Sequence, residues 1–137
     1  MLDTDVVVAA MRSPRGGSAE QLRRIDGGKA VMLLTVALAL EYEAICTLAE
    51  HRLASGLGAS EAGIYVDGLI GLAEPARAFF RWRPQLRDPG DELVLEAAVN
   101  GQADAIVTFN QGHLREAHST FGIDVIRPAE ALRRIKK

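Results

Sequence analysis

Short, continuously apolar segments alternate along the chain with longer segments of helical periodicity, and this alternation limits the possible folds more than any other feature. The apolar segments are Lys29 to Leu34, Ala105 to Val107 and Ile123 to Ile126, and a short run that ends at Asp3 leads into a helical stretch. Continuous apolar character is typical of strands buried on both faces, as in a parallel sheet. The sequence therefore predicts a three-layer α/β/α domain with a mainly parallel central sheet of about four to five strands.

The expected helices lie between these strands, and capping residues and glycines set their limits. They are Ser18 to Ile25, Thr35 to about Leu53, Ser60 to about Ala73, Asp91 to Asn100, Gln111 to His118 and Pro128 to Ile135, with Ser18, Thr35 and Ser60 as N-caps. Ala76 to Trp82 alternates with the period of a strand and adds a further expected strand. No repeat, low-complexity tract or linker interrupts the pattern, so residues 1–137 are expected to form one domain.

Composition and charge restrict the classes of function. The 137 residues are 48% hydrophobic and 25% charged, which is typical of globular domains and not of disordered chains or coiled coils. The longest apolar stretch, Ala30 to Leu40, is shorter than the roughly 20 residues that cross a bilayer, and the acids near Met1 do not suit a secretory signal. Cys46 is the only cysteine, so we expect a buried thiol in a reducing, cytoplasmic protein. With a net charge of -2, any contact with nucleic acid is expected to be local.

Three acidic residues fall near the strand ends that a parallel sheet brings together. Asp3 ends the first strand, Glu41 lies on the helix after the second, and Asp91 begins the helix before the strand Ala105 to Val107. At 100° per residue, Glu41 lies on the inward face of its helix, whereas Glu43 points away. We therefore expect these three carboxylates to converge. The alternative is a Glu41 at the rim, with its stem packed and its head in water.

A group of carboxylates needs a compensating charge. An inward carboxylate among apolar neighbours is costly unless it is paired or binds a cation. Several carboxylates in one place raise one another's pKa unless a divalent cation neutralises them. The group offers hard oxygen ligands without a matching cluster of His or Cys, so the expected ion is Mg²⁺ or Mn²⁺ rather than zinc.

Five short segments contain these acids and their neighbours. They read Leu2-Asp3-Thr4-Asp5-Val6-Val7, Ser13-Pro14-Arg15-Gly16, Leu40-Glu41-Tyr42, Arg87-Asp88-Pro89-Gly90-Asp91 and Ala103-Asp104-Ala105-Ile106-Val107-Thr108-Phe109-Asn110. No segment is specific alone, but together with Gly122 to Pro128 their order and spacing resemble the PIN domain family, specifically its toxin components of toxin-antitoxin pairs. The resemblance implies a Rossmann-like sheet with an acidic pocket that binds Mg²⁺ or Mn²⁺, and cleavage of single-stranded or structured RNA.

The resemblance also implies a catalytic set. Asp3, Glu41 and Asp91 match the family's three acids and would hold one or two Mg²⁺ or Mn²⁺ ions. Asn110 matches a position where the family has either Asp or Asn, and completes the set. Hydrolysis at such a site would leave a 5′-phosphate and a 3′-hydroxyl.

Further residues are expected to contact ligands and substrate. Thr4 and Thr108 would position both. Arg87, beside the third acid, and Arg15 or Arg12, after the first strand, are the candidates for contacts with RNA phosphates.

Two positions depart from the family's pattern, and one assignment is ambiguous. Asp5 stands where the family usually has Asn, and either adds a charge beside the pocket or caps the next helix. His113 stands where members with Asn at the Asn110 position often carry an acid, which predicts a weaker, three-acid site. Asp88 is the alternative to Asp91 as the third acid, but we expect it to be the cap of that helix.

Three functions fit these residues. The first is a metal-dependent endoribonuclease that cuts RNA, acts as the toxin of a type II toxin-antitoxin pair, is neutralised by an antitoxin protein, and forms a homodimer. The second is a catalytically weakened PIN scaffold that binds RNA or a protein without cleavage, motivated by Asn110 and His113. The third is a haloacid dehalogenase-type phosphatase, since Asp3-Thr4-Asp5-Val6 fits its nucleophile motif. The absence of Lys between Lys29 and Lys136 argues against it.

Overall fold

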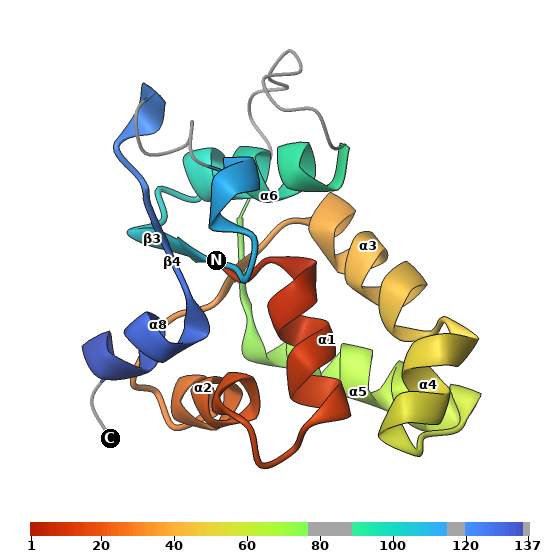
Figure 1. The fold of residues 1–137 in the computed structure, drawn as a ribbon. Coiled ribbons are helices and arrows are strands. Elements are labelled where there is room, and N and C mark those ends of the chain that lie inside the picture. Colours follow the sequence, from red (N-terminus) through yellow and green to blue (C-terminus); the bar gives the residue numbers. More distant parts are fainter. Residues whose placement is uncertain (77–88, 115–119, 136–137) are drawn as a thin grey trace.

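The computed structural model describes residues 1–76, 89–114 and 120–135, and its description of side chains excludes residues 89–92 and 113. Helices dominate this part of the chain and surround two short pairs of strands (Figure 1). In chain order the elements are α1 (Thr4–Arg12), α2 (Gly17–Asp26), β1 (Leu33–Leu34), α3 (Val36–Cys46), α4 (Ala49–Ser55), α5 (Ala59–Leu72), β2 (Glu74–Pro75), α6 (Pro89–Asn100), β3 (Ala105–Val107), the 3₁₀ helix η1 (Gln111–Leu114), β4 (Asp124–Ile126) and α8 (Pro128–Arg134).

The strands pair in parallel, as predicted. β1 pairs with β2, and β3 pairs with β4 with Ile106 opposite Val125. Leu2 forms an isolated parallel bridge with Val107, where the N–H of Asp3 donates to the Val107 carbonyl at 2.9 Å. Within residues 1–76, 89–114 and 120–135 the strands form two sheets of two strands each, so a continuous sheet of four to five strands is not confirmed.

Several element boundaries follow local rules that the sequence displays. The chain turns from Leu2 directly into α1 at Thr4, as expected from a first strand that ends at Asp3. The side chain of Thr35 accepts the N–H of Leu38 at 3.2 Å and so caps α3 as predicted. Pro128 occupies the first turn of α8, where the missing N–H carries no cost.

Two predicted caps are wrong. α2 begins after Gly16, and Ser18 lies inside the helix, where it is buried. α5 begins after Gly58 rather than at Ser60, because the Glu61 side chain reaches back to accept the Gly58 N–H at 3.2 Å. In both places a glycine enters the helix in an extended conformation one or two residues earlier than the nearest serine.

The helix predicted from Thr35 to about Leu53 is broken into α3 and α4. The Thr47 hydroxyl donates to the carbonyl of Glu43 at 2.7 Å, and Leu48 is extended. The Arg52 guanidinium then donates to the carbonyl of Thr47 at 3.0 Å. The Glu43 carbonyl also accepts the backbone N–H of Thr47 at 3.2 Å, so these side-chain bonds add to the backbone bonds that end α3.

The strands are shorter than predicted, and one predicted strand lies partly outside the described residues. Of Lys29 to Leu34, only β1 is a strand. β2 lies just before the expected strand at Ala76 to Trp82. From residue 77 onward that strand lies outside the described residues, and so do its aromatic residues Phe80 and Trp82. The helix expected at Gln111 to His118 is described only as η1.

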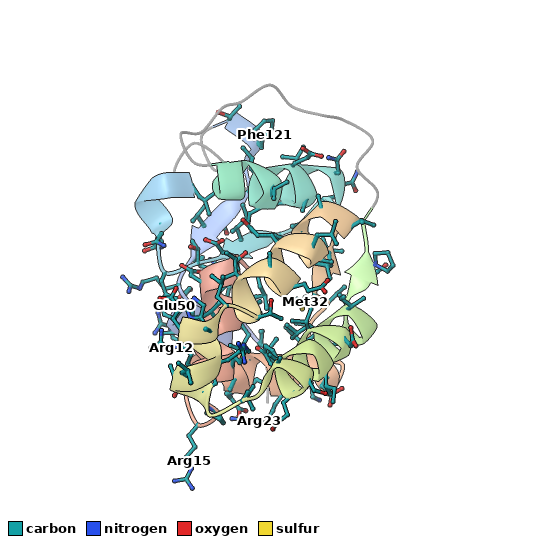
Figure 2. All side chains as sticks on the ribbon, turned by 90° about the vertical axis from the view of Figure 1, so that its right-hand side faces the viewer. Arg12, Arg15, Arg23, Met32, Glu50 and Phe121 are labelled. Atoms are coloured by element: carbon teal, nitrogen blue, oxygen red, sulfur yellow. The ribbon has the colours of Figure 1, made fainter. Side chains whose placement is uncertain are left out.

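Two tyrosines attach the helices α3 and α5 to the segment that carries Asp3. Tyr42 is fully buried and its hydroxyl donates to the carbonyl of Leu2. The Tyr65 hydroxyl donates to the carbonyl of Val7 at 2.8 Å. Around them the apolar core fills the space between the helices, with Met32 1% exposed in the interior (Figure 2). The start of α1 is thus fixed by packing and by hydrogen bonds from two other helices.

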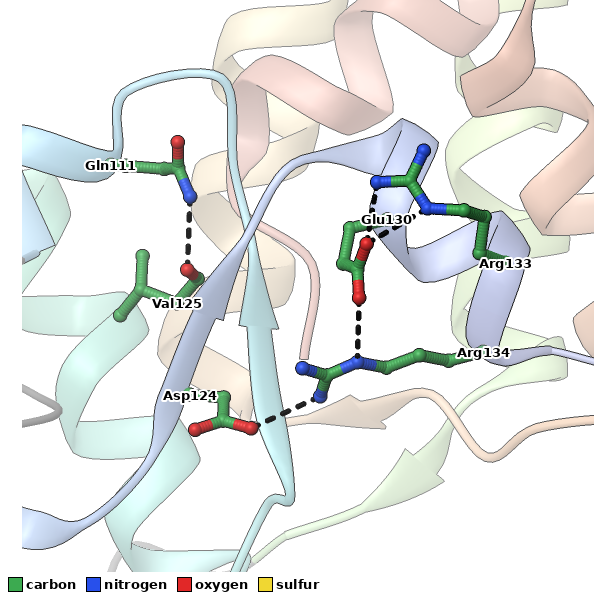
Figure 3. A network of polar contacts seen from close by, with 6 residues as sticks. All are labelled: Gln111, Asp124, Val125, Glu130, Arg133 and Arg134. Carbon is green, nitrogen blue, oxygen red and sulfur yellow. Dashed lines mark hydrogen bonds and ion pairs between the residues drawn. The ribbon is translucent and has the colours of Figure 1, made fainter.

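The basic end of α8 is held against β4 rather than extended into solvent. Arg134 donates to Asp124 at 3.0 Å and to Glu130 at 3.3 Å, while Arg133 contacts Glu130 (Figure 3). Gln111 donates to the carbonyl of Val125 at 3.0 Å on the same strand. Because these ion pairs are exposed to solvent, they orient the end of α8 and contribute little to stability.

Cys46 is a buried thiol, as expected. It is 0% exposed, and burial raises its pKa to about 11, which disfavours the reactive thiolate. In the described part of the chain, no helix has the length and apolar character that crossing a membrane requires.

Tyr42→Phe tests whether the buried hydroxyl fixes the Leu2 carbonyl. The substitution keeps the ring and removes the only donated bond of the side chain, so we expect the free energy of unfolding to fall by about 1–2 kcal/mol. Urea denaturation measures this loss, and Tyr65→Phe is the matched control, because its hydroxyl is only partly buried. A loss for Tyr42→Phe no greater than that for Tyr65→Phe would contradict this account.

Candidate active site

Asp3 lies between Leu2, which forms the bridge to Val107, and the first residue of helix α1, Thr4. Its Oδ1 accepts the backbone N–H of Thr4 at 2.8 Å, which makes Asp3 the N-cap of the helix. The side chain is 7% exposed. Strand pairing on one side and helix capping on the other therefore give this buried carboxylate a single position.

Thr108 continues β3 toward Asp3. Its N–H donates to the Ile126 carbonyl at 2.9 Å, and its side chain is fully buried. The Thr108 hydroxyl donates to Oδ2 of Asp3 at 2.7 Å and accepts the backbone N–H of Asn110 at 3.0 Å. The predicted proximity of Asp3, Thr108 and Asn110 is therefore observed, and the threonine hydroxyl is the link between them.

Glu41 reaches the same place from α3. The Thr4 hydroxyl donates to Oε2 of Glu41 at 2.6 Å, and the glutamate is half-buried while Glu43 is exposed. Glu41 therefore points toward Asp3, but the buried face of α3 is formed by Leu38, Tyr42 and Cys46, so a fully inward Glu41 is not confirmed. Thr4 contacts two acids at once, since its N–H donates to Asp3 and its hydroxyl to Glu41.

Asp5 contacts more residues of the candidate site than its position in the sequence indicates. Its Oδ2 accepts the N–H of Phe109 at 3.0 Å and the side-chain amide of Asn110 at 3.2 Å, and lies 3.3 Å from the Thr108 hydroxyl. Asp5 does not cap α1, because Asp3 does. Of the two alternatives for Asp5, the structure shows the charge beside the pocket.

The environment of Asp5 is unfavourable for a second negative charge. Its Oδ1 is buried and accepts no hydrogen bond from the described residues. Burial, and then the charge of Asp3, raise the pKa of Asp5 to about 6, although the bond from the Phe109 N–H opposes the shift. Two carboxylates thus meet at one threonine hydroxyl, which has a single proton to donate.

Asp91 lies in the first turn of α6, which packs against α3 and β3. Its helix is therefore next to the elements that carry Glu41 and Thr108. The side chains of Asp91 and His113 lie outside the described residues, and so do Arg87 and Asp88 altogether. The convergence of Asp91 with the other two acids stays a prediction.

Arg15 and Arg12 are not brought to the acids. Arg12 is the last residue of α1 and Arg15 follows it, so a whole helix separates both from Asp3. At 1.5 Å per residue, that helix spans roughly 13 Å. Arg15 is exposed and points away from the body of the protein (Figure 2). The sequence predicts a helical stretch after Asp3, and this helix carries the loop with Arg15 away from the acids.

The described carboxylates do not by themselves form a metal site. Among residues whose side chains are described, no group of three His, Cys, Asp or Glu side chains is arranged to hold a metal ion. Asp3 and Asp5 meet at Thr108, and Glu41 is linked to Asp3 through Thr4. The oxygen donors are of the hard type that Mg²⁺ and Mn²⁺ prefer, and the orphaned Oδ1 of Asp5 is an acceptor that a cation would satisfy.

A separate cavity of about 620 Å³ is lined by Ala105 and Val107 of β3 and by the segment from Lys29 to Leu33. Gln21, Met32, Gln102 and Ala105 are among the residues that line it, and none of the predicted site residues does. It is therefore not part of the candidate active site.

Asp5→Asn tests the raised pKa through the pH dependence of stability. An ordinary aspartate has a pKa of 3.8, and Asp5 titrates near 6 when folded, so the folded state holds this proton more tightly and stability falls as pH rises from about 4 to 6. Asn does not titrate. The measured quantity is the thermal midpoint of Asp5→Asn minus that of the original protein, both in EDTA. We expect this difference to increase by about 3 °C between pH 4 and pH 7, after allowance for solvent screening. A difference that does not change with pH would refute this assignment.

Comparisons with known proteins agree with the site's position in the sequence. Neither curated proteins nor solved structures gave a match. The family model described as PIN domain matches residues 1–112, a span that includes Asp3, Glu41, Asp91 and Asn110. Because this match covers most of the chain and contains the whole acidic site, the chain belongs to the PIN domain family.

Proposed function

We propose that this protein is an endoribonuclease that depends on Mg²⁺ or Mn²⁺ and hydrolyses RNA phosphodiesters. PIN domains are generally nucleases that use divalent metal ions, which supports the general activity. The observation that carries the proposal is the double contact of Thr4. Its N–H orients Asp3 and its hydroxyl orients Glu41, so one residue sets two acids from different parts of the chain beside each other.

Asp3, Glu41 and Asp91 are the residues that would hold the ion. The bonds from Thr4 and Thr108 reach different oxygens of Asp3 and so hold both oxygens in place. Oε2 of Glu41 is oriented in the same way by Thr4. These bonds therefore fix the carboxylates before an ion binds, which lowers the cost of assembling the site.

The chemistry that a bound divalent ion supplies is Lewis acidity toward the phosphodiester and a lowered pKa for an attacking water. The protein's own groups supply position. Thr4 and Thr108 donate their hydroxyl protons to Glu41 and Asp3, so we assign them to the acids rather than to the substrate. Asn110 holds the loop after β3 through its contacts with Thr108 and Asp5. Arg87 and Arg15 remain the proposed contacts with RNA phosphates, and Arg15, beyond the far end of α1, would contact the RNA away from the acids.

The proposal includes the biological setting that the sequence resemblance implies. The protein would be the toxin of a type II toxin-antitoxin pair, with an antitoxin protein as partner, and would act as a homodimer in the cytoplasm. Its small net charge of -2 supports recognition of a short RNA segment at the site rather than of a long duplex.

A PIN scaffold that binds without cleaving is the second candidate, favoured by Asn110 and His113 in place of a fourth acid. The phosphatase hypothesis depended on Asp3-Thr4-Asp5-Val6 alone, and the match to the PIN domain model accounts for this segment without it.

Asp3→Asn separates the two candidates. Asn is as good an N-cap as Asp, so the variant is expected to fold, but it offers the ion no negative charge. With Mn²⁺ and a fluorescent single-stranded RNA, we expect the original protein to cleave and Asp3→Asn to show at least a hundredfold lower rate. Asp26→Asn, an exposed change at the end of α2, is the matched control and should cleave normally.

EDTA should stop cleavage by the original protein. If Mn²⁺ binds and Glu41→Gln weakens that binding, but no RNA is cut, the binding scaffold is correct. Cleavage that survives in Asp3→Asn would reject the proposed site.

A further inference from the structure

We propose that Asp5 is an additional ligand of the divalent ion in this site, bound directly or through one water. The proposal rests on the proposed function, because it concerns the same ion. It is based on the difference in hydrogen bonding between the two carboxylate oxygens of Asp5. Oδ2 accepts the N–H of Phe109 and the side-chain amide of Asn110 and lies 3.3 Å from the Thr108 hydroxyl, whereas Oδ1 is buried and accepts no hydrogen bond from the described residues.

A buried carboxylate oxygen without a partner is rare and needs an explanation. In water such an oxygen would accept hydrogen bonds, so burial without a replacement costs free energy. An ion that binds Oδ1 would remove this cost. None of the described Lys, Arg or His side chains forms an ion pair with Asp5 that would serve instead.

The position of Asp5 relative to Asp3 also suits a shared ion. Oδ2 of Asp3 lies 2.7 Å and Oδ2 of Asp5 lies 3.3 Å from the same Thr108 hydroxyl oxygen, so the two carboxylate oxygens are within about 6 Å of each other. This bound places the two carboxylate groups beside each other, and Oδ1, the oxygen of Asp5 that would bind the ion, belongs to the same group. Each carboxylate is already held by other bonds, Asp3 by Thr4 and Asp5 by Phe109, so neither would have to be ordered on binding.

The competing explanation is that Asp5 only clamps the loop after β3 to α1. This clamp consists of bonds that Oδ2 accepts from Phe109 and from the Asn110 side chain. Asp5→Asn keeps an acceptor for both bonds and removes the charge. Asn110→Ala has the opposite effect, because it removes one clamp bond and keeps the Asp5 carboxylate. The two variants therefore separate a ligand from a clamp.

The test is isothermal titration of Mn²⁺ into the original full-length protein and the variants at pH 7. We expect Asp5→Asn to weaken Mn²⁺ binding at least tenfold and Asn110→Ala to weaken it less than threefold. Asp26→Asn, exposed at the end of α2, should bind as the original protein does. Circular dichroism in EDTA checks that each variant is folded.

One result would overturn the assignment of Asp5 and leave the proposed nuclease site intact. In that result Asp5→Asn binds Mn²⁺ within threefold of the original affinity, while Asp3→Asn binds it much more weakly. A larger loss in Asn110→Ala than in Asp5→Asn would assign Asp5 to the clamp and also overturn it. If the original protein binds no Mn²⁺, the proposed function and this inference both fail.

Discussion

The hydrogen bond from the Thr108 hydroxyl to the Asp3 carboxylate joins the two halves of the site. Thr108 comes from the end of β3 and is held by its backbone bond to Ile126. Asp3 comes from the start of α1 and is held by its backbone bond to Val107 and by its own cap. Because both side chains are buried, water does not compete for their bond, and the carboxylate is held as firmly as the strand beside it.

The same arrangement concentrates negative charge. Asp5 approaches the Thr108 hydroxyl that Asp3 already uses, and Glu41 is tied to Asp3 through Thr4. A chain selected only for stability would avoid this, since like charges near one another in a partly buried place oppose folding. Such local cost is typical of sites that bind or react, where groups are held ready for a ligand.

Local rules explain which parts the sequence could predict. The cap at Thr35 depends on neighbours within one helical turn and is confirmed, and periodicity also distinguishes Glu41, which contacts Thr4, from the exposed Glu43. The break between α3 and α4 occurs where Leu48 is extended, which periodicity cannot reveal. The clamp between Asp5 and Phe109 joins residues 104 positions apart, so its existence required the fold. The distance of Arg15 from Asp3 is set by the length of α1, which closeness in sequence does not reveal.

The central claim is that Asp3, Glu41 and Asp91 share one divalent ion. Anomalous diffraction from crystals soaked in Mn²⁺ tests it most directly. The account predicts a manganese peak within about 2.5 Å of carboxylate oxygens of Asp3 and Asp91, with Glu41 in contact directly or through water. A map without that peak, or carboxyl groups of these three residues too far apart to reach a common ion, would contradict it.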